Sequence, residues 1–355
     1  MIDTQSAVLG KTSLFKKKKP IRVLLTACGS PGSSTMIRQL QKHGCYVIGV
    51  DMNPEAIGRW MCDEFDVVPA ADDPSYVVEL AALSAVFDAD IILPQSSCEA
   101  PILAQWGYMM ECPVLVGNPK SMAVANNKAA MYLWLTGATD IPLPRTNYLN
   151  GTGSAKTASK VLQNAIDEWG AIVIKPCVGK GSRGVRIIDP AMSLRDQMLG
   201  KPDSKYVTLE QVEQAFSDGF PEMLVMEKLE GEELAVDVLC LDGEVLLHTV
   251  RTVETQRAGV VMTGEIVDRP EIVEQVKAIL KAIPLSYCVN LQFIGGKLIE
   301  INPRVSTFIY QDDVCMPFLA IQLALDKISK EDIIEKQDKI AIGRRMVRYL
   351  DQRFM

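Results

Sequence analysis

Short apolar runs alternate with helical stretches over the first part of the chain. Apolar runs bounded by glycine, proline or polar residues are typical of buried strands, whereas apolar residues spaced three or four apart indicate helices. Their alternation predicts a parallel sheet covered by helices. The predicted strands are 21–26, 46–50, 66–69, 91–94 and 114–116, and the predicted helices are 34–43 and 75–87.

A glycine turn follows the first predicted strand, with Gly29 and Gly32 just ahead of a helix. Such turns can bind a dinucleotide, and Asp51 ends the second strand about where a ribose-binding acid would lie. The turn lacks the Gly-x-Gly-x-x-Gly spacing, so a substrate-binding or structural role is equally open. Ligands of parallel sheets gather at the carboxyl ends of the strands. Ser30, Asp51 and Glu99 lie at those ends and are candidate substrate-binding residues.

A second glycine-rich segment lies between two apolar strands. Strand 172–176 contains Lys175, loop 178–185 contains three glycines, and strand 186–188 returns. Such a loop can fold over phosphates and offer backbone N–H groups, although a plain hairpin has the same pattern. A lysine in a buried strand needs an anionic partner, which favours phosphate binding.

The remaining pattern mixes helices and strands. We expect helices at 155–169, 208–216, 271–283 and 317–325, one more that begins at Ser121 and carries Asn127 and Lys128, and strands at 223–226, 234–241 and 245–250.

Near the end of the chain, residues 289–301 read as a tight hairpin that turns at Gly295-Gly296. Side chains alternate faces along a strand, so Glu300 and Asn302 point the same way, and Gln292 can face them from the outgoing strand. One carboxylate and two amide oxygens are hard ligands of the kind that Mg²⁺ takes. Arg304 follows, where its donors could meet a phosphoryl or carboxylate oxygen. The alternative is a solvated edge hairpin with incidental polar residues.

Composition limits the classes of protein to which the chain can belong. The chain has 355 residues, enough for two or three domains, and its net charge of −7 does not suggest nucleic-acid binding. The nine cysteines show no Cys-x-x-Cys pair, which favours reduced thiols and a cytoplasmic location. No apolar run approaches the length of a membrane helix, and residues 1–20 read as a flexible basic tail.

The order of these parts resembles the ATP-grasp superfamily, most closely the carbamoyl-phosphate-synthetase-like carboxylate–amine ligases. The resemblance covers about Ile21 to Leu325. It is carried by Lys128, by Ile174-Lys175-Pro176 with the glycine loop, by Met226-Glu227-Lys228-Leu229 with Gly231 and Glu233, and by Asn290-Leu-Gln292-Phe with Glu300-Ile-Asn302-Pro-Arg304-Val-Ser306.

The resemblance implies an α/β fold of the ATP-grasp type. A parallel-sheet domain at 21–120 would precede two α+β lobes that clasp ATP, at about 121–190 and 191–355. It also implies ATP and Mg²⁺ as cofactors, with Mn²⁺ as an alternative ion. The implied partners are a small carboxylic acid and an amine, without nucleic acid or membrane, and the chain could pair as a homodimer.

The resemblance also implies roles for single residues. Phosphates of ATP would be held by Lys128, Lys175 and a loop with Gly179, Lys180, Gly181, Ser182 and Gly184. Adenine would meet the backbone of Glu227, Lys228 and Leu229, and the ribose would meet Glu233. The metal would bind Gln292, Glu300 and Asn302. The catalytic residues would be Arg304, Lys175 and Arg257, with Arg257 and Ser306 also near the substrate.

The implied reaction forms an acyl phosphate and then a bond to the amine. The chain has one ATP-grasp unit and no glutamine-amidotransferase part, which argues against carbamoyl phosphate synthesis itself. Two other classes stay open: a nucleotide-binding regulator with an inactive site, and an NAD-dependent oxidoreductase that uses the first glycine turn.

Overall fold

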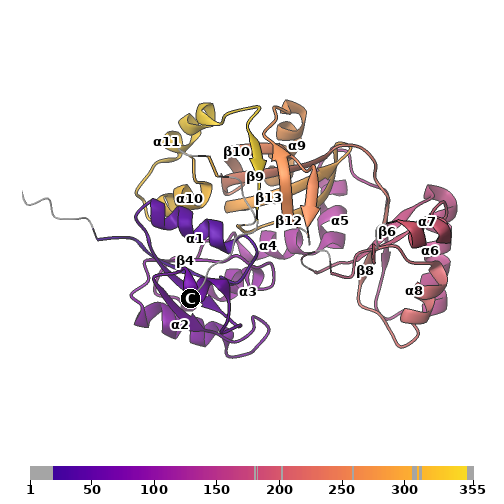
Figure 1. The fold of residues 1–355 in the computed structure, drawn as a ribbon, viewed down its shortest axis with the longest axis horizontal. Helices are drawn as coiled ribbons and strands as arrows, with labels where there is room; N and C mark the ends of the chain where they lie inside the picture. The colour runs from indigo at the N-terminus through magenta and orange to yellow at the C-terminus, as the bar shows by residue number, and fades with distance from the viewer. Residues whose placement is uncertain are drawn as a thin grey trace, which may run out of the picture.

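The computed structural model describes residues 19–179, 181, 183–200, 203–257, 260–305, 310–311 and 314–349. Figure 1 shows these residues as an N-terminal domain, a central lobe and a smaller lobe that stands apart at the right of the view. No helix within the described ranges is long and apolar enough to cross a membrane. The calls on residues 1–18, Lys180, Ser182 and Ser306 lie outside the described residues.

The N-terminal domain is built on a parallel sheet with the strand order β3-β2-β1-β4. The fifth strand expected at 114–116 is wrong as a full strand, because Val114 forms only an isolated bridge to Ile92. The domain's elements are β1 (Arg22–Leu25), α1 (Ser33–Lys42), β2 (Tyr46–Asp51), η1 (Ile57–Trp60), β3 (Glu64–Val67), α2 (Tyr76–Val86), β4 (Ile91–Leu93), α3 (Ala100–Trp106) and η2 (Gly107–Met109).

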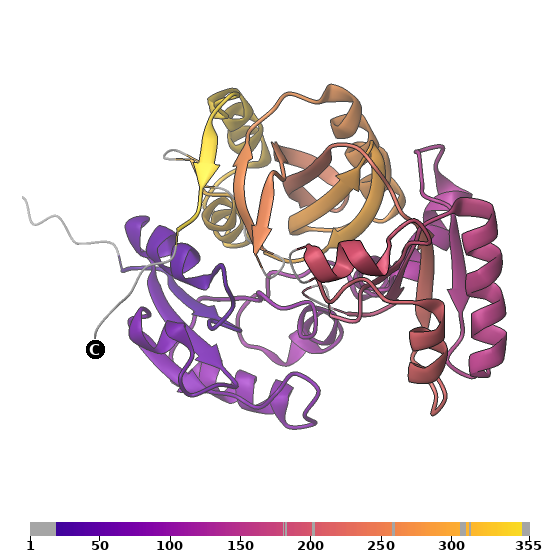
Figure 2. The same cartoon turned by 45° about the vertical axis from the view of Figure 1, so that its right-hand side comes forward.

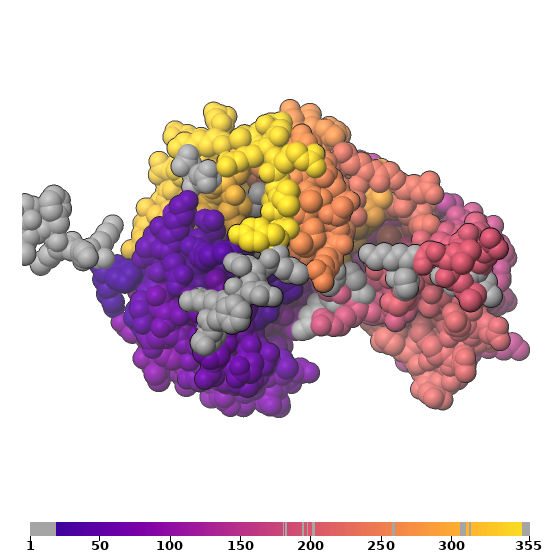
Figure 3. All heavy atoms as spheres, viewed as in Figure 1, coloured from indigo at the N-terminus to yellow at the C-terminus, as the bar shows by residue number. Residues whose placement is uncertain are grey.

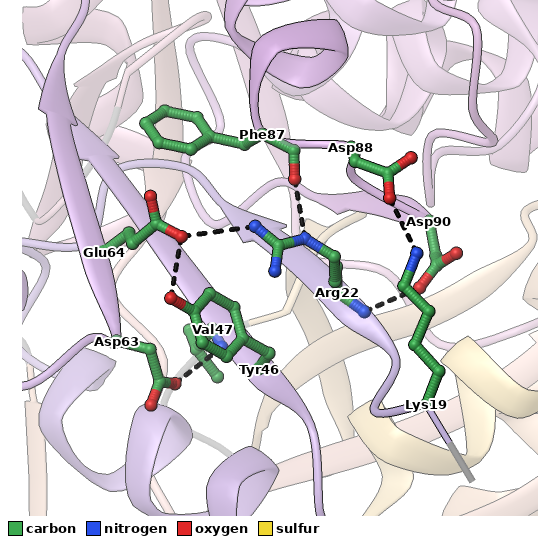
Figure 4. Close-up of polar contacts among 9 residues, drawn as sticks. All are labelled: Lys19, Arg22, Tyr46, Val47, Asp63, Glu64, Phe87, Asp88 and Asp90. Carbon is green, nitrogen blue, oxygen red and sulfur yellow. Dashed lines mark hydrogen bonds and ion pairs between the residues drawn. The ribbon is translucent and has the colours of Figure 1, made fainter.

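Charged side chains join the strands at the amino-terminal end of this sheet (Figure 4). The Arg22 backbone N–H donates to Asp90 (2.7 Å), its Nε donates to the Phe87 carbonyl (2.7 Å), and its Nη2 meets Glu64 (3.2 Å). Lys19 pairs with Asp88 at 2.7 Å, but both side chains are exposed and the pair contributes little stability. The opposite, carboxyl end of the sheet carries the glycine turn.

The smaller lobe has a sheet with the order β5-β8-β6-β7. Because β8 pairs with both β5 and β6, this lobe extends past the expected boundary at residue 190. Its elements are β5 (Thr146–Leu149), α6 (Ala155–Trp169), β6 (Ile172–Pro176), β7 (Arg186–Ile188), α7 (Leu194–Leu199), α8 (Leu209–Ala215) and β8 (Met223–Glu227).

The central lobe contains an antiparallel sheet with the order β10-β9-β13-β14 and a small sheet with the order β11-β12-β15. Its elements are β9 (Glu233–Leu241), β10 (Glu244–Thr252), β11 (Thr255–Arg257), β12 (Val260–Glu265), α9 (Pro270–Ala282), β13 (Tyr287–Ile294), β14 (Lys297–Asn302), α10 (Met316–Ala324), α11 (Lys330–Ile334), η3 (Glu335–Lys339) and β15 (Arg345–Val347).

The helix expected to run from Ser121 through Lys128 is wrong, because the chain breaks at Asn127 into α4 (Pro119–Asn126) and α5 (Lys128–Ala138). Asn127 has an extended backbone, and its side-chain oxygen accepts from the N–H groups of Ala129 and Ala130. This N-cap starts a second helix at the residue that the sequence marks as a phosphate ligand.

Two of the three parts share a hydrophobic core. Met36 and Ile37 of α1 belong to the same cluster as Leu239 of β9 and Ile321 of α10. The smaller lobe has a cluster of its own that contains Leu162, and Leu224 and Met226 on the other face of β8 pack with the central lobe. The N-terminal domain and central lobe therefore pack as one body, and Figure 2 shows the smaller lobe extending from it.

The turn of the β13–β14 hairpin is pressed against the connection between β8 and β9. Gly295 has φ +55°, donates its N–H to the Glu232 carbonyl (3.0 Å), and would place a Cβ against the Glu230 carbonyl oxygen. Gly231, with φ +114°, would place a Cβ 3.0 Å from the Gly295 Cα. Both positions require glycine for lack of space as well as for conformation.

We expect Gly295→Ala to lower the free energy of unfolding by about 2 kcal/mol or more, because it combines a left-handed backbone with a backbone clash. Gly296→Ala is the matched control: Gly296 has φ +76° but open space around its Cα, so its loss should be about 1 kcal/mol. Urea denaturation measures both. Equal losses would show that the contact with Glu230 contributes nothing.

Candidate functional site

The β13–β14 hairpin brings the predicted metal ligands together. Gln292 lies opposite Glu300 and Asn290 lies opposite Asn302, so these four side chains share one face. Within the described residues, no hydrogen bond or ion pair reaches the side chains of Gln292, Glu300 or Asn302. Three oxygen-bearing side chains therefore remain available on the face that the sequence predicted.

Asn290 has a different role, which sequence reasoning missed. Its Nδ2 donates to Asp237 Oδ1 (2.7 Å), and Arg251 Nε donates to Asp237 Oδ2 (3.4 Å). All three side chains are almost completely buried, and Asp237 lies directly opposite Asn290 in the sheet. The signal that could have found this network is a charged residue inside each of two apolar strands.

Lys175 and Lys128 are both buried beside this hairpin. Lys175 Nζ donates to the Ile299 carbonyl of β14 (3.1 Å), and the Lys128 N–H donates to the Cys177 carbonyl (2.9 Å). Burial lowers the pKa of Lys175 to about 8, while the Glu300 carboxylate acts in the opposite direction and Lys128 lowers it further. The structure thus gathers two cations and one carboxylate at the predicted phosphate and metal positions.

Arg304 connects the end of the hairpin to the N-terminal domain. Its Nε donates to Ser97 Oγ (2.6 Å), and its Nη1 donates to the Val305 carbonyl (3.2 Å). Burial lowers the pKa of Arg304, with Glu300 and Glu99 acting in the opposite direction. Among the described residues no carboxylate forms an ion pair with this guanidinium.

The predicted hinge is held by the side chain of Glu227. It accepts hydrogen bonds from the Arg145 backbone (3.0 Å), from Arg145 Nε (2.8 Å) and from Lys297 Nζ of β14 (2.6 Å). Burial alone would raise the pKa of Glu227, but these donors outweigh it and hold the value at about 2. The side chain therefore ties the smaller lobe to the central hairpin, a role that the sequence did not predict.

The other predicted nucleotide residues lie near this hinge. The Lys228 side chain pairs with Asp189 at 2.8 Å, and its N–H donates to the Ala171 carbonyl, while Leu229 follows in the same connection. Glu233, at the start of β9, accepts from Gln256 Nε2 (2.8 Å), and burial raises its pKa. The predicted roles of these residues toward adenine and ribose stay predictions.

Described residues of the glycine loop line a hollow between the smaller lobe and the N-terminal domain. Gly179, Gly184 and Arg183 line a pocket of about 370 Å³ together with Ser97 and Cys98 of the N-terminal domain. Gly184 has φ +74°, and a Cβ there would lie 2.7 Å from the Pro176 ring. Gly181 and Arg183 also line the larger cleft described next.

A cleft of about 1220 Å³ runs from Arg304 along the carboxyl edge of the N-terminal sheet. Figure 3 shows the surface hollowed between the indigo N-terminal domain and the pink smaller lobe. The cleft brings together Ser30, Asp51, Glu99 and Arg304, all predicted site residues. Arg257 is exposed on β11 and is not among the lining residues, although its neighbour Gln256 is.

Glu99 and Asp51 help to build the cleft wall. Glu99 is buried and accepts from Thr26 Oγ1 (2.6 Å), Tyr76 OH (2.8 Å) and the N–H groups of Gln95 and Ser96, and burial raises its pKa. Asp51 accepts from the N–H groups of Gly29 (2.8 Å) and Asn53 (2.9 Å). Both carboxylates shape the loops at this edge.

Comparison with known proteins agrees with this geometry. Residues 219–345 match the model of a family described as ATP-grasp in the biosynthetic pathway with Ter operon. The fold resembles Rhizobium etli pyruvate carboxylase (TM-score 0.64, 17% identity, 92% of this chain and 30% of that one). It also resembles Campylobacter jejuni biotin carboxylase, with a TM-score of 0.62, 16% identity, and coverage of 92% of this chain and 74% of that one. A third similar structure is a Bacillus licheniformis L-amino acid ligase, with a TM-score of 0.56, 14% identity, and coverage of 81% of this chain and 68% of that one.

The chain therefore has a fold similar to that of these proteins, and its residues 219–345 resemble an ATP-grasp family. A curated relative, the uncharacterized protein y4rH of Sinorhizobium fredii, is 31% identical over 234 residues. That alignment covers 64% of this chain and 44% of the relative, so the chain spans less than half of that protein's length.

We expect Glu227→Gln to lower the free energy of unfolding at pH 7 by about 2 kcal/mol, because two charge-assisted hydrogen bonds lose their acceptor charge. The folded-state pKa of about 2 lies below the unfolded value. The stabilisation is therefore complete above about pH 4.5 and is lost as the pH falls toward 2.

Urea denaturation at pH 7 and at pH 4 measures the difference, which should shrink at the lower pH. Glu232→Gln is the control, because the Glu232–Arg269 pair is largely exposed and should contribute less than about 1 kcal/mol. A Glu227→Gln loss that does not depend on pH would contradict the assignment.

Proposed function

We propose that the protein is an ATP-dependent ligase that activates a substrate carboxylate as an acyl phosphate and joins it to an amine. The observation that supports this best is the face of the β13–β14 hairpin. There no hydrogen bond or ion pair within the described residues reaches the side chains of Gln292, Glu300 or Asn302, and the buried Lys175 and the partly buried Arg304 are close enough to Glu300 for its charge to affect their pKa values. A ligand with phosphates and a divalent cation would complement this arrangement.

The donor set fits Mg²⁺. One carboxylate and two amide oxygens on one face suit a hard cation that keeps several waters. Within the described residues there is no cluster of three or more histidine, cysteine, aspartate or glutamate side chains that would indicate a softer or higher-affinity metal site. When bound, the ion would neutralise phosphate charge, with Gln292, Glu300 and Asn302 holding it.

In the proposed first step, an oxygen of the substrate carboxylate bonds to the γ-phosphorus of ATP, and the bond from that phosphorus to the β,γ-bridging oxygen breaks. ADP leaves with the bond's electron pair. Lys128 and Lys175 would hold the phosphates, and Arg304 would stabilise the charge on the transferred group. The buried cations need no large reorganisation, because hydrogen bonds to Ile299 and Ser97 already fix them.

In the second step, the amine nitrogen bonds to the acyl carbon and phosphate leaves with the carbon–oxygen electron pair, while the amine gives up a proton. No protein nucleophile is required, so the chain's main contribution is to hold the reactants in line. The cleft lined by Arg304 would accept the acid next to the phosphates, which supports this arrangement. The L-amino acid ligase that shares the fold supports the carbon–nitrogen class of reaction.

The test is a screen of carboxylic acids with Mg-ATP, with hydroxylamine as the acceptor. Hydroxylamine traps an acyl phosphate as a hydroxamate without knowledge of the natural amine. We expect equal amounts of ADP and hydroxamate from at least one acid. Tight Mg-ATP binding without hydroxamate or ADP from any acid would instead support a nucleotide-binding regulator.

Glu300→Gln should lower the rate of hydroxamate formation by at least about a hundredfold while the fold is retained, because it removes the full negative charge among the proposed metal ligands. Glu271→Gln, at an exposed position on α9, removes the same charge away from the site and should leave the rate unchanged. Wild-type activity of Glu300→Gln at saturating Mg²⁺ would exclude this metal site.

The affinity for Mg-ATP should fall as the pH rises above about 8, because the Lys175 pKa is about 8 and its neutral form cannot attract phosphate. The limit is about tenfold per pH unit for one proton. Isothermal titration calorimetry between pH 7 and 9 measures the effect. Lys175→Met should bind weakly at every pH in this range, and an unchanged pH dependence in that variant would assign the effect to another group.

A further inference from the structure

Two cysteine side chains meet beneath the glycine turn of the N-terminal domain. Cys28 follows β1 and is completely buried, whereas Cys62 lies between η1 and β3 and is partly buried. A Cβ built on Gly49 of β2 would lie 3.0 Å from Cys28 Sγ and 2.6 Å from Cys62 Sγ. Both sulfurs therefore lie side by side over the same position of β2, although they come from different loops.

Two glycines provide the space that these sulfurs fill. Gly49 lies inside a strand, where glycine ordinarily costs about 0.5–1 kcal/mol relative to alanine. Gly58 lies in η1, and a Cβ there would lie 2.2 Å from Cys28 Sγ. Neither glycine has a left-handed backbone, so conformation does not require glycine at these positions. The pair of thiols is what excludes a side chain at Gly49, and Cys28 excludes one at Gly58.

The two thiols also interact with each other. A side-chain hydrogen bond with Cys62 is the main reason that the pKa of the Cys28 thiol is raised, followed by burial and by the charges of Cys62 and Asp51. A raised pKa means that Cys28 keeps its proton, so Cys28 is the donor of this hydrogen bond and the Cys62 sulfur is the acceptor. Because Cys62 is also the more accessible of the two, an oxidant should react with Cys62 first.

A second pair of neighbouring cysteines has a different arrangement. Cys240 of β9 lies opposite Tyr287 of β13, and the next residue of β13, Cys288, lies opposite Leu239. Side chains alternate faces along a strand, so Cys240 and Cys288 point to opposite faces of the sheet. The Cys240 thiol donates instead to the Leu285 carbonyl (3.3 Å). This pair is an internal control, because it cannot form a disulfide without rearrangement of the sheet.

Both Cys28 and Cys62 belong to segments that line the large cleft. The turn that contains Cys28 contributes Ala27 and Gly29 to the lining, and the segment that leads to Cys62 contributes Ile57. Ala27 has φ +45°, a left-handed backbone that is strained for a residue with a side chain. A bond between the two sulfurs would therefore act on a strained turn in the wall of the cleft.

Joining the sulfurs requires a shift of the backbone. The Sγ–Sγ distance of a disulfide is about 2.05 Å, much shorter than the contact between two hydrogen-bonded thiols. Two hydrogen bonds tie the turn to β2: the Cys28 N–H donates to the Val50 carbonyl (3.2 Å), and the Gly29 N–H donates to Asp51 Oδ2 (2.8 Å). Exchange of these two amide hydrogens therefore reports whether the turn shifts.

We propose that Cys28 and Cys62 are a redox modification site, at which hydrogen peroxide forms a reversible disulfide that alters the cleft wall at the glycine turn. The peroxide first transfers an oxygen to the Cys62 sulfur, which becomes a sulfenic acid as the O–O bond breaks and water leaves. The Cys28 sulfur then bonds to the Cys62 sulfur, the S–O bond breaks, and the Cys28 proton leaves with the hydroxyl group as water. A dithiol reductant reverses the bond by thiol–disulfide exchange. This inference does not rest on the proposed ligase activity.

The test treats the full chain with a small excess of hydrogen peroxide, alkylates the free thiols and maps the products by mass spectrometry. We expect a product lighter by two hydrogen atoms, with a cross-link between the Cys28 and Cys62 peptides that dithiothreitol removes. The Cys240 and Cys288 thiols should stay reduced. Hydrogen–deuterium exchange of residues 27–32 should be about tenfold faster in the oxidised protein, because the hydrogen bonds of the turn to β2 break.

Cys62→Ala should give no cross-link and no change of exchange under the same treatment. Cys98→Ser is the matched control, because Cys98 is an exposed cysteine that lines the same cleft, and its loss should leave the Cys28–Cys62 cross-link in place. If the peroxide converts Cys62 of the wild type to a sulfinic acid without a cross-link, or if Cys62 pairs with Cys98, the inference is overturned. A Cys28–Cys62 cross-link that leaves exchange of the turn unchanged would overturn the proposed change of the cleft wall.

Discussion

The close packing of two backbone segments fixes the position of the functional hairpin. The turn at Gly295 lies directly against Glu230 and Gly231, with no room for a side chain at either glycine. Because the turn cannot move without opening this contact, the contact fixes the position of β14 relative to the smaller lobe. Its carbonyl groups then meet Tyr132 (3.0 Å from Leu298) and Lys175 (3.1 Å from Ile299). The positions of the polar side chains on the hairpin therefore depend on this backbone contact, which itself contains no functional group.

The distribution of apolar cores decides which parts can move relative to each other. The N-terminal domain shares its main cluster with the central lobe, whereas the smaller lobe has a cluster of its own and also packs Leu224 and Met226 of β8 against the central lobe. The Glu227 side chain, with Arg145 and Lys297, adds a polar tie between the smaller lobe and the hairpin. The smaller lobe is therefore joined to the central lobe by one apolar face of β8 as well as by this polar tie, while its helices α6 and α8 pack on a cluster of their own.

Buried charge is the second constraint on this site. Burial lowers the pKa of both Lys175 and Arg304, so the folded chain bears a cost for keeping each of them charged. In the Asp237–Arg251 pair, the cost of burying a cation is offset by a carboxylate from the same sheet. Cations without such a partner are suited to an anionic ligand.

Local sequence determined the parts of this protein whose geometry depends on neighbours in the chain. The Gly295-Gly296 turn fixed the pairing of Ile294 with Lys297, and helical spacing predicted α6 over its full extent. However, a register shift between Gln292 and Phe293 places Gln292 opposite Glu300 instead of Ile299. The same local signals could not show that Asn127 caps a new helix, because a cap depends on the backbone angle at one residue. They also could not show that residues 114–116 form only an isolated bridge.

Tertiary structure alone decided the contacts between segments distant in sequence. It placed β8 in the smaller lobe beyond residue 190, joined Lys297 to Glu227, and put Arg304 beside Ser97, 207 residues away. It also brought Ser30, Asp51 and Glu99 into one cleft with Arg304. Strand order in a sheet depends on the packing of the whole domain, and no local pattern encodes it. The polar residues of the hairpin were therefore readable from the sequence, whereas the set of residues that lines the cleft beside Arg304 was not.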